Sequence, residues 1–146
     1  MVKFVGKEKV KTAIFISGRG SNLKSLYKYS KKKISLINIK LIVSDNKKAK
    51  GLLFAKKKKL KIFIINYSNR TAAESVIRKI LKKNNIYLIC LAGFMKILSK
   101  SFIKSFEGKI LNIHPSLLPK YKGLNTHKRV INNNEGFSGC TVHLVN

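Results

Sequence analysis

An asparagine and a histidine stand two residues apart near the end of an apolar stretch, as Asn112 and His114. Since side chains alternate along a strand, both would project from one face while Ile113 turns to the other. An amide can donate a hydrogen bond to a developing oxyanion, and an imidazole can supply or accept a proton near neutral pH. Pro115 and Pro119 restrict the backbone that follows, and rigid presentation is what such a pair requires. The pattern favours catalysis over an ordinary core histidine.

A second polar segment, "SGRGSN" at residues 17–22, puts two glycines between an apolar run and an expected helix start. Glycine lets the backbone approach a ligand closely, and the first N–H groups of a helix attract anions. A dinucleotide fingerprint would need a third glycine at Leu23, and a P-loop would need Gly-Lys-Ser/Thr. A phosphate monoester held by backbone amides and by the Ser21 and Asn22 side chains needs nothing that is missing. Taken alone, the loop fits a phosphate site and a tight turn equally well.

The other chemically capable side chains give weaker signals. His127 and His143 belong to no cluster with zinc-ligand spacing, so we expect no metal site. Arg70 stands at an expected helix start and could meet an acidic ligand tail, although a solvated side chain is the more ordinary outcome. Cys90 and Cys140 are far apart in apolar surroundings, and two thiols form no disulfide framework. We expect both to be buried and reduced.

Strands and helices alternate along the chain, and nearly all-apolar strands indicate a parallel sheet covered on both faces. The predicted strands are 12–17, 34–43, 61–65, 87–92, 109–113 and 140–145; the predicted helices begin near Ser21 or Asn22 and span 49–58, 71–83 and 99–108, the last closed by Gly108. The inward-facing helical positions are Leu52, Leu53 and Ala55, then Val76, Ile77, Ile80 and Leu81. We therefore predict one domain over residues 1–146 with an open, doubly wound, Rossmann-like α/β fold. Ligands collect at the carboxyl ends of such strands, so both polar segments should face one crevice.

The formal net charge is +27, from 32 basic and 5 acidic residues. The excess is mostly lysine, accompanied by abundant isoleucine and asparagine, a composition that AT-rich codons produce without selection for binding DNA. Lysine clusters at 31–33, 56–59 and 82–83 fall at predicted helix ends, where cations suit the helix dipole, and no aromatic residues are interleaved with them for base stacking. A solvated surface is favoured over a nucleic-acid footprint, although its field should attract anionic metabolites.

Neither a signal peptide nor a membrane span is expected. Charged residues interrupt the amino-terminal segment from Lys3 onward. The longest apolar run, 86–97, contains Lys96 and falls short of the roughly 20 residues that cross a bilayer. A cytoplasmic protein without a membrane partner is predicted.

Four segments, in this order, resemble phosphoribosylglycinamide formyltransferase, the folate-dependent family of purine synthesis. They are "ISGRGSNL", "LAGFMKIL", "ILNIHPSLLPKYKGLNTHKR" and "GCTVHLV", and the similarity runs from about Thr12 to the last residue. "NIHPSLLP" by itself marks the wider formyltransferase superfamily, which includes methionyl-tRNA formyltransferase and formyltetrahydrofolate deformylase. The "SGRGSN" loop narrows the match to the glycinamide ribonucleotide enzyme.

The resemblance implies that the glycinamide amine attacks the formyl carbon of 10-formyltetrahydrofolate, a cosubstrate, with no metal and no covalent enzyme intermediate. It implies two small-molecule partners, no specific nucleic acid, and a monomer or homodimer. Asn112 and protonated His114 would stabilise the tetrahedral oxyanion, and His114 would help proton transfer to the departing folate nitrogen. The implied substrate contacts are Gly20, Ser21 and Asn22 for phosphate, and Arg70, Met95, Lys96, Ile97, Leu98 and Asn112 for folate.

One feature of the family has no counterpart among these residues. Family members carry a catalytic aspartate in an Asp-Gly-Gly stretch a few residues past the position that matches Asn146. The five acidic residues, none of which matches it, are Glu8, Asp45, Glu74, Glu107 and Glu135. The expectation is a C-terminally truncated family member. Its alternatives are a methionyl-tRNA formyltransferase, favoured only by the basic surface, and a non-catalytic substrate-binding remnant.

The sequence predicts that the 146-residue chain binds the phosphate substrate better than it catalyses, because an acidic partner is needed to orient and stabilise the imidazolium. The measurement is formyl transfer by this chain beside a full-length relative, together with substrate affinity. A comparable transfer rate would contradict the prediction.

Overall fold

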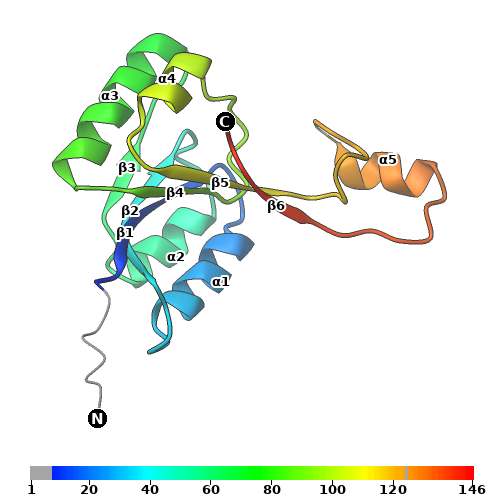
Figure 1. Cartoon of the computed structure of the whole chain (residues 1–146), viewed down its shortest axis with the longest axis horizontal. Coiled ribbons are helices and arrows are strands. Elements are labelled where there is room, and N and C mark those ends of the chain that lie inside the picture. Colours follow the sequence, from blue (N-terminus) through cyan, green and yellow to red (C-terminus); the bar gives the residue numbers. More distant parts are fainter. Residues whose placement is uncertain (1–7, 124) are drawn as a thin grey trace.

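A six-stranded sheet, shown in Figure 1, organises residues 8–123 and 125–146, which are the residues that the computed structural model describes. The strand order is β3-β2-β1-β4-β5-β6. The strands are β1 (Val10–Ile16), β2 (Ile37–Ser44), β3 (Ile62–Ile64), β4 (Leu88–Leu91), β5 (Lys109–His114) and β6 (Thr141–Leu144). β6 pairs antiparallel with β5, and the other neighbours pair parallel. The predicted open, mostly parallel sheet is confirmed, with strand bounds displaced by at most three residues.

Helices cover both faces of the sheet. The helices are α1 (Ser21–Ser30), α2 (Gly51–Lys57), α3 (Arg70–Lys83), α4 (Lys100–Ser105) and α5 (Thr126–Asn132). Figure 1 shows α1 and α2 on one face and α3 and α4 on the other. The helix α5, which follows β5 and precedes β6 in the chain, lies beyond the sheet. The sequence did not predict α5, a short helix with Thr126 and Val130 buried and the rest exposed.

Alternation along β1 shows how the chain fills both layers. Ala13 and Phe15 pack in the core beneath α3 and α4, whereas Ile14 and Ile16 pack in the core beneath α1 and α2. All four side chains are fully buried. A strand apolar on both faces is what a sheet sandwiched between helices requires.

A close approach of two glycines joins α1 to α2. Gly20 has φ +75°, and a Cβ built on it would lie 2.7 Å from the Cα of Gly51. The predicted caps of α1 are wrong: Ser21 and Asn22 lie within the helix, and Gly20 precedes it without any side-chain cap. Glycine replaces the polar cap here because only a residue without a side chain fits against Gly51 in this left-handed conformation.

Several other expectations need correction. Leu53 is 69% exposed and Val76 is 46% exposed, because the residues beside them on each helix already face the sheet. α4 ends at Ser105, before Gly108, whose role is instead to pass beside Tyr87, where a Cβ would lie 2.2 Å from the carbonyl oxygen. Cys140 is exposed, since it lies on the segment that leads from α5 into β6. Cys90 is buried as predicted.

The lysine clusters do lie at helix ends. Lys31 is the C-cap of α1, and the last turns of α2 and α3 contain Lys56 and Lys57, and Lys82 and Lys83. Positive charges at these C-terminal ends interact favourably with the partial negative charge of the helix dipole. No helix within the described residues is long and apolar enough to cross a bilayer.

Neighbouring residues of α3 provide a test of this packing. Ile77 is 1% exposed and Val76 is 46% exposed. Ile77→Ala should lower the free energy of unfolding by about 2–5 kcal/mol, because it leaves a cavity beneath the sheet. Val76→Ala should change it by less than about 1 kcal/mol. Denaturant unfolding of both variants measures the difference, and equal losses would contradict this orientation of α3.

Candidate functional site

The register of three neighbouring strands brings the predicted site segments to one edge of the sheet. Phe15 of β1 pairs with Leu91 of β4, and Leu91 pairs with Asn112 of β5. Because these strands are parallel and about 4.8 Å apart, the carboxyl ends of β1 and β5 lie about 10 Å from each other, with β4 between them. Residues 95–98 are called the donor segment below, because the resemblance predicts that they contact the formyl donor. The glycine loop (residues 17–22), the donor segment and the Asn112–His114 pair therefore emerge side by side.

The glycine loop is held by backbone hydrogen bonds to the loops around it. The Ser17 amide donates to the Gly93 carbonyl at 3.1 Å, and the Gly51 amide donates to the Gly18 carbonyl at 3.0 Å. α1 then begins with no side-chain cap and no acidic residue in its first turn. Its first amide groups and the positive end of its dipole are thus suited to an anion.

Cations surround the outer side of the glycine loop. A hollow of about 430 Å³ lies there, lined by Arg19, Lys24, Lys50, Leu53, Phe54 and Lys57. Its lining holds four basic side chains and no carboxylate. The local field therefore favours a negatively charged ligand group beside the loop.

The donor segment presents apolar side chains to solvent. Met95 is 65% exposed and Ile97 is 81% exposed, while Leu98 is 6% exposed and belongs to the core. Lys96 extends toward Asp45, with 3.8 Å between Nζ and Oδ2. Exposed apolar side chains at a sheet edge are able to cover a planar ring, whereas Leu98 can offer little surface to a ligand.

Asn112 is paired with His143, a histidine for which the sequence predicts no role. The Asn112 Nδ2 lies 3.2 Å from His143 Nε2, and His143 Nδ1 lies 2.9 Å from the Leu144 carbonyl oxygen. A carbonyl can only accept, so Nδ1 carries the proton and a neutral Nε2 accepts from the amide. His143 faces Asn112 because β6 pairs antiparallel with β5 in this register. Only the strand pairing reveals the partnership, since 31 residues separate the two.

His114 makes its hydrogen bond to the loop that follows β5. Its Nε2 lies 3.0 Å from the Tyr121 carbonyl oxygen, which can only accept, so Nε2 is protonated. The Ser116 hydroxyl also closes this loop by donating to the Lys120 carbonyl at 2.7 Å. A carboxylate from beyond α5, Glu135, bonds to this loop, where it accepts from the Tyr121 hydroxyl at 2.8 Å rather than from the imidazole. The hydrogen bond from Tyr121, and then the one from the Lys120 ammonium, lower the pKa of Glu135.

Arg70 is the first residue of α3 and is exposed. One helical turn later, the buried Glu74 carboxylate accepts from the Ser99 amide at 2.7 Å and from the Ser99 hydroxyl, at the end of the donor segment. Residues four apart share one side of a helix, so Arg70 lies on the side of α3 that faces this segment. Glu74 also accepts from Tyr67, whose pKa is raised by burial and then by that carboxylate. The phenol therefore stays a donor.

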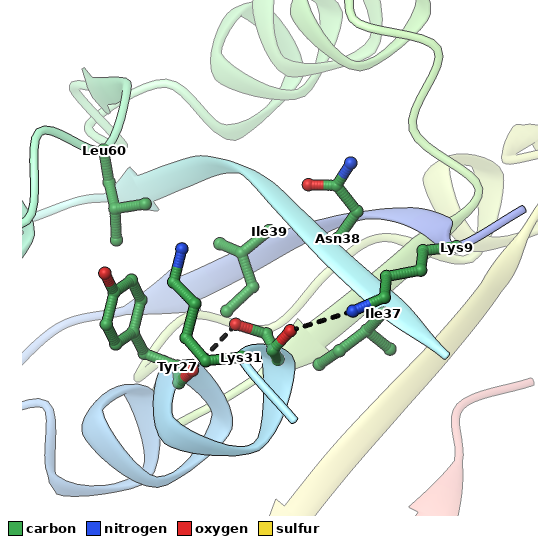
Figure 2. A pocket seen from close by; sticks show the side chains of 8 residues that line it. Lys9, Tyr27, Lys31, Ile37, Asn38, Ile39 and Leu60 are labelled. Atoms are coloured by element: carbon green, nitrogen blue, oxygen red, sulfur yellow. Dashed lines mark hydrogen bonds between the residues drawn. The ribbon is translucent and has the colours of Figure 1, made fainter. Parts of the chain in front are cut away.

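The remaining features offer less chemistry. No group of three potential metal ligands occurs among the described residues. Burial raises the pKa of Cys90 to about 11, so its thiol stays protonated and unreactive at neutral pH. His127 is exposed on α5. Figure 2 shows a separate pocket by the amino ends of β1 and β2, where Lys9 reaches the Ser30 carbonyl; it contains none of the predicted site residues.

Comparisons with known proteins identify the family of the chain. The family model described as formyl transferase matches residues 10–146. The chain is 46% identical over 140 residues to the trifunctional purine biosynthetic protein adenosine-3 of Gallus gallus, covering 94% of this chain and 14% of that protein. It is 41% identical over 139 residues to the phosphoribosylglycinamide formyltransferase of Haemophilus influenzae, covering 93% of this chain and 66% of that enzyme.

Solved structures show the same fold. The crystal structure of phosphoribosylglycinamide formyltransferase from Brucella melitensis superposes with a TM-score of 0.88 at 38% identity, covering 94% of this chain and 73% of that one. The Coxiella burnetii protein of the same name gives a TM-score of 0.86 at 38% identity, covering 94% and 66%. The family match spans nearly all described residues, including both strand ends that carry the candidate site. The chain belongs to the formyl transferase family.

Proposed function

We propose that this chain binds glycinamide ribonucleotide and 10-formyltetrahydrofolate and takes part in formyl transfer from the folate to the amine. The observation that carries the proposal is the register of β1, β4 and β5, which puts the glycine loop, an exposed apolar surface and the Asn112–His114 pair at one sheet edge. The names of the Haemophilus and Brucella relatives favour glycinamide ribonucleotide over a tRNA as acceptor.

The phosphate of the acceptor would bind at the start of α1. Gly20 would let the backbone come close to the phosphate. The amides of Ser21 and Asn22 would donate to it, since no capping side chain accepts from them. Arg19 and Lys24, which line the adjoining hollow, would add long-range attraction. The proposal needs no metal because backbone amides and cations are sufficient for one phosphate.

The folate would lie along the donor segment, with the formyl group toward β5. Met95 and Ile97 would contact the ring through their exposed side chains, and Arg70 would meet the acidic tail from the start of α3. Lys96 and Leu98 would help shape the segment, through the ion pair with Asp45 and through the core. In this arrangement the phosphate would lie at the carboxyl end of β1 and the formyl group near that of β5, with β4 and the donor segment between them.

The polar pair would act on the tetrahedral intermediate. Attack of the amine on the formyl carbon forms a C–N bond and an oxyanion; collapse breaks the bond to the folate nitrogen, which takes up a proton as the amine loses one. Asn112 keeps a second amide N–H, besides the one given to His143, that can donate to the oxyanion. The N–H at Nε2 of His114 donates to the Tyr121 carbonyl. We therefore assign to Nδ1 the proton that is exchanged during the reaction.

Loss of the Asn112 amide should slow transfer far more than it weakens binding. Asn112→Ala should reduce the single-turnover rate of formyl transfer by about 10²–10³-fold, the usual cost of losing one oxyanion donor. Asn38→Ala is the matched control, since Asn38 lies on β2 near the opposite edge of the sheet. If the unsubstituted chain bound neither substrate and transferred no formyl group, the proposed function would be wrong.

The His143 partnership makes a second prediction. His143→Phe removes the acceptor that orients the Asn112 amide, and should lower the transfer rate by about tenfold with little change in substrate affinity. His143→Gln, which can still accept, should recover most of the rate. His127→Phe, on the exposed face of α5, should have no effect. Equal rates for the two His143 variants would show that the histidine does not position Asn112.

A further inference from the structure

Asp45 is a nearly buried carboxylate between the two proposed substrate subsites. It directly follows β2, and its side chain is 8% exposed. The Ser17 hydroxyl donates to its Oδ1 at 2.5 Å, and the Lys96 Nζ lies 3.8 Å from its Oδ2. Ser17 starts the glycine loop and Lys96 belongs to the donor segment. A desolvated carboxylate needs such partners, so its position favours one arrangement of the two segments.

The Ser17 hydroxyl is the junction between them. It accepts from the Met95 amide at 2.8 Å while it donates to Asp45. A hydroxyl has a single proton. Because this proton points to the Asp45 carboxylate in a hydrogen bond, the lone pair of the Ser17 oxygen is left pointing to the Met95 amide. The backbone amide of Ser17 bonds to the Gly93 carbonyl, and this second link starts just before the donor segment.

The hydrogen bond to Ser17 matters more than the ion pair. The Lys96 side chain is 44% exposed and its separation from Asp45 is long, so solvent screens the pair and it contributes little. A charge-assisted hydrogen bond in a nearly buried position is stronger. Asn46 adds to the same junction by donating from Nδ2 to the Ser17 carbonyl at 3.1 Å.

Glu74 provides a useful contrast. It binds Ser99 at the far end of the donor segment and Tyr67 ahead of α3, with no hydrogen bond to the glycine loop among the described residues. Glu74 therefore anchors the donor segment to α3, whereas Asp45 ties that segment to the glycine loop. Of these two carboxylates, Asp45 is the one whose partners belong to both subsites.

We propose that Asp45 is a positioning residue that, through Ser17, holds the glycine loop and the donor segment in one fixed arrangement, so that a ligand at either one strengthens binding at the other. The part about ligands rests on the proposed function, because it takes the loop as the phosphate subsite and the donor segment as the folate subsite. Such linkage is reciprocal and operates through the shared hydrogen bonds.

The first test needs no ligand. Amide hydrogen exchange is measured at Met95, with the Ile14 amide in the middle of β1 as a reference for global stability. Ser17→Ala removes the acceptor, and Asp45→Ala leaves the Ser17 hydroxyl free to rotate; each should speed Met95 exchange about tenfold relative to Ile14. Asp45→Asn keeps an oxygen acceptor and should stay within about threefold of the unsubstituted chain.

The second test measures linkage with inorganic phosphate and folic acid as probes. In the unsubstituted chain, saturating phosphate should raise folic acid affinity about fivefold, and folic acid should raise phosphate affinity by the same factor. In Asp45→Ala the factor should fall to about one. Glu107→Ala, which removes an equal charge from an exposed position, should leave exchange and linkage unchanged.

The outcomes separate the two proposals. If the unsubstituted chain binds neither probe, the proposed function is wrong, and so is the part of the inference that concerns ligands. The exchange rate of the Met95 amide still tests whether Asp45 positions the two segments. If both probes bind but Asp45→Ala leaves either Met95 exchange or the linkage factor unchanged, the inference is overturned and the proposed function stands. A variant that only refolds more slowly or is less stable would show faster amide exchange at Ile14 as well as at Met95.

Discussion

Parallel strands end at the same edge of a sheet, and the candidate site depends on this constraint at β1, β4 and β5. Their pairing is continuous from Phe15 through Leu91 to Asn112, so the three loops that follow must emerge together. Helices on both faces secure the pairing by burying the alternating side chains of β1 in two separate cores. The buried side chains of these strands take no part in the proposed chemistry but hold its groups in place, including Asn112 and His114 at the end of β5 itself.

Close backbone contacts then set how the loops pack at that edge. Gly20 and Gly51 meet at a separation that no side chain would permit, and this brings the start of α2 against the start of α1. The uncapped amides of α1 remain available as a result, in a region where the only nearby charges lining the hollow are positive. The proposed anion binding would therefore depend on backbone geometry first and on side-chain charge second.

Carboxylates have a distinct structural role in so basic a chain. Asp45 and Glu74 are the two least exposed acidic side chains of the described residues, and each is satisfied by serine donors on another segment. Both serines, Ser17 and Ser99, flank stretches assigned to substrates. A buried carboxylate with full hydrogen bonding specifies one arrangement of its partners, because leaving it unpaired is costly.

Residue types and their spacing were enough to predict the succession of strands and helices along the chain, and to put the glycine loop and the Asn112–His114 pair at the carboxyl ends of strands. Each of these depends on short-range periodicity or on the chemistry of neighbouring residues. Membership of the family followed from the same segments and is confirmed. The outward direction of Leu53 and Val76 was missed, since adjacent positions on short apolar helices compete for one face. α5 was missed because its sequence has few apolar residues to mark a period.

Pairings between distant residues were decided by tertiary structure alone. The antiparallel register of β6 chose His143 as the partner of Asn112, and the packing of loops chose Asp45 for Ser17 and Tyr121 for His114. Local sequence determines which groups can donate or accept and, along a strand, which residues share a face. It does not determine which of many compatible partners they meet, because that depends on how separately formed elements stack around a common core.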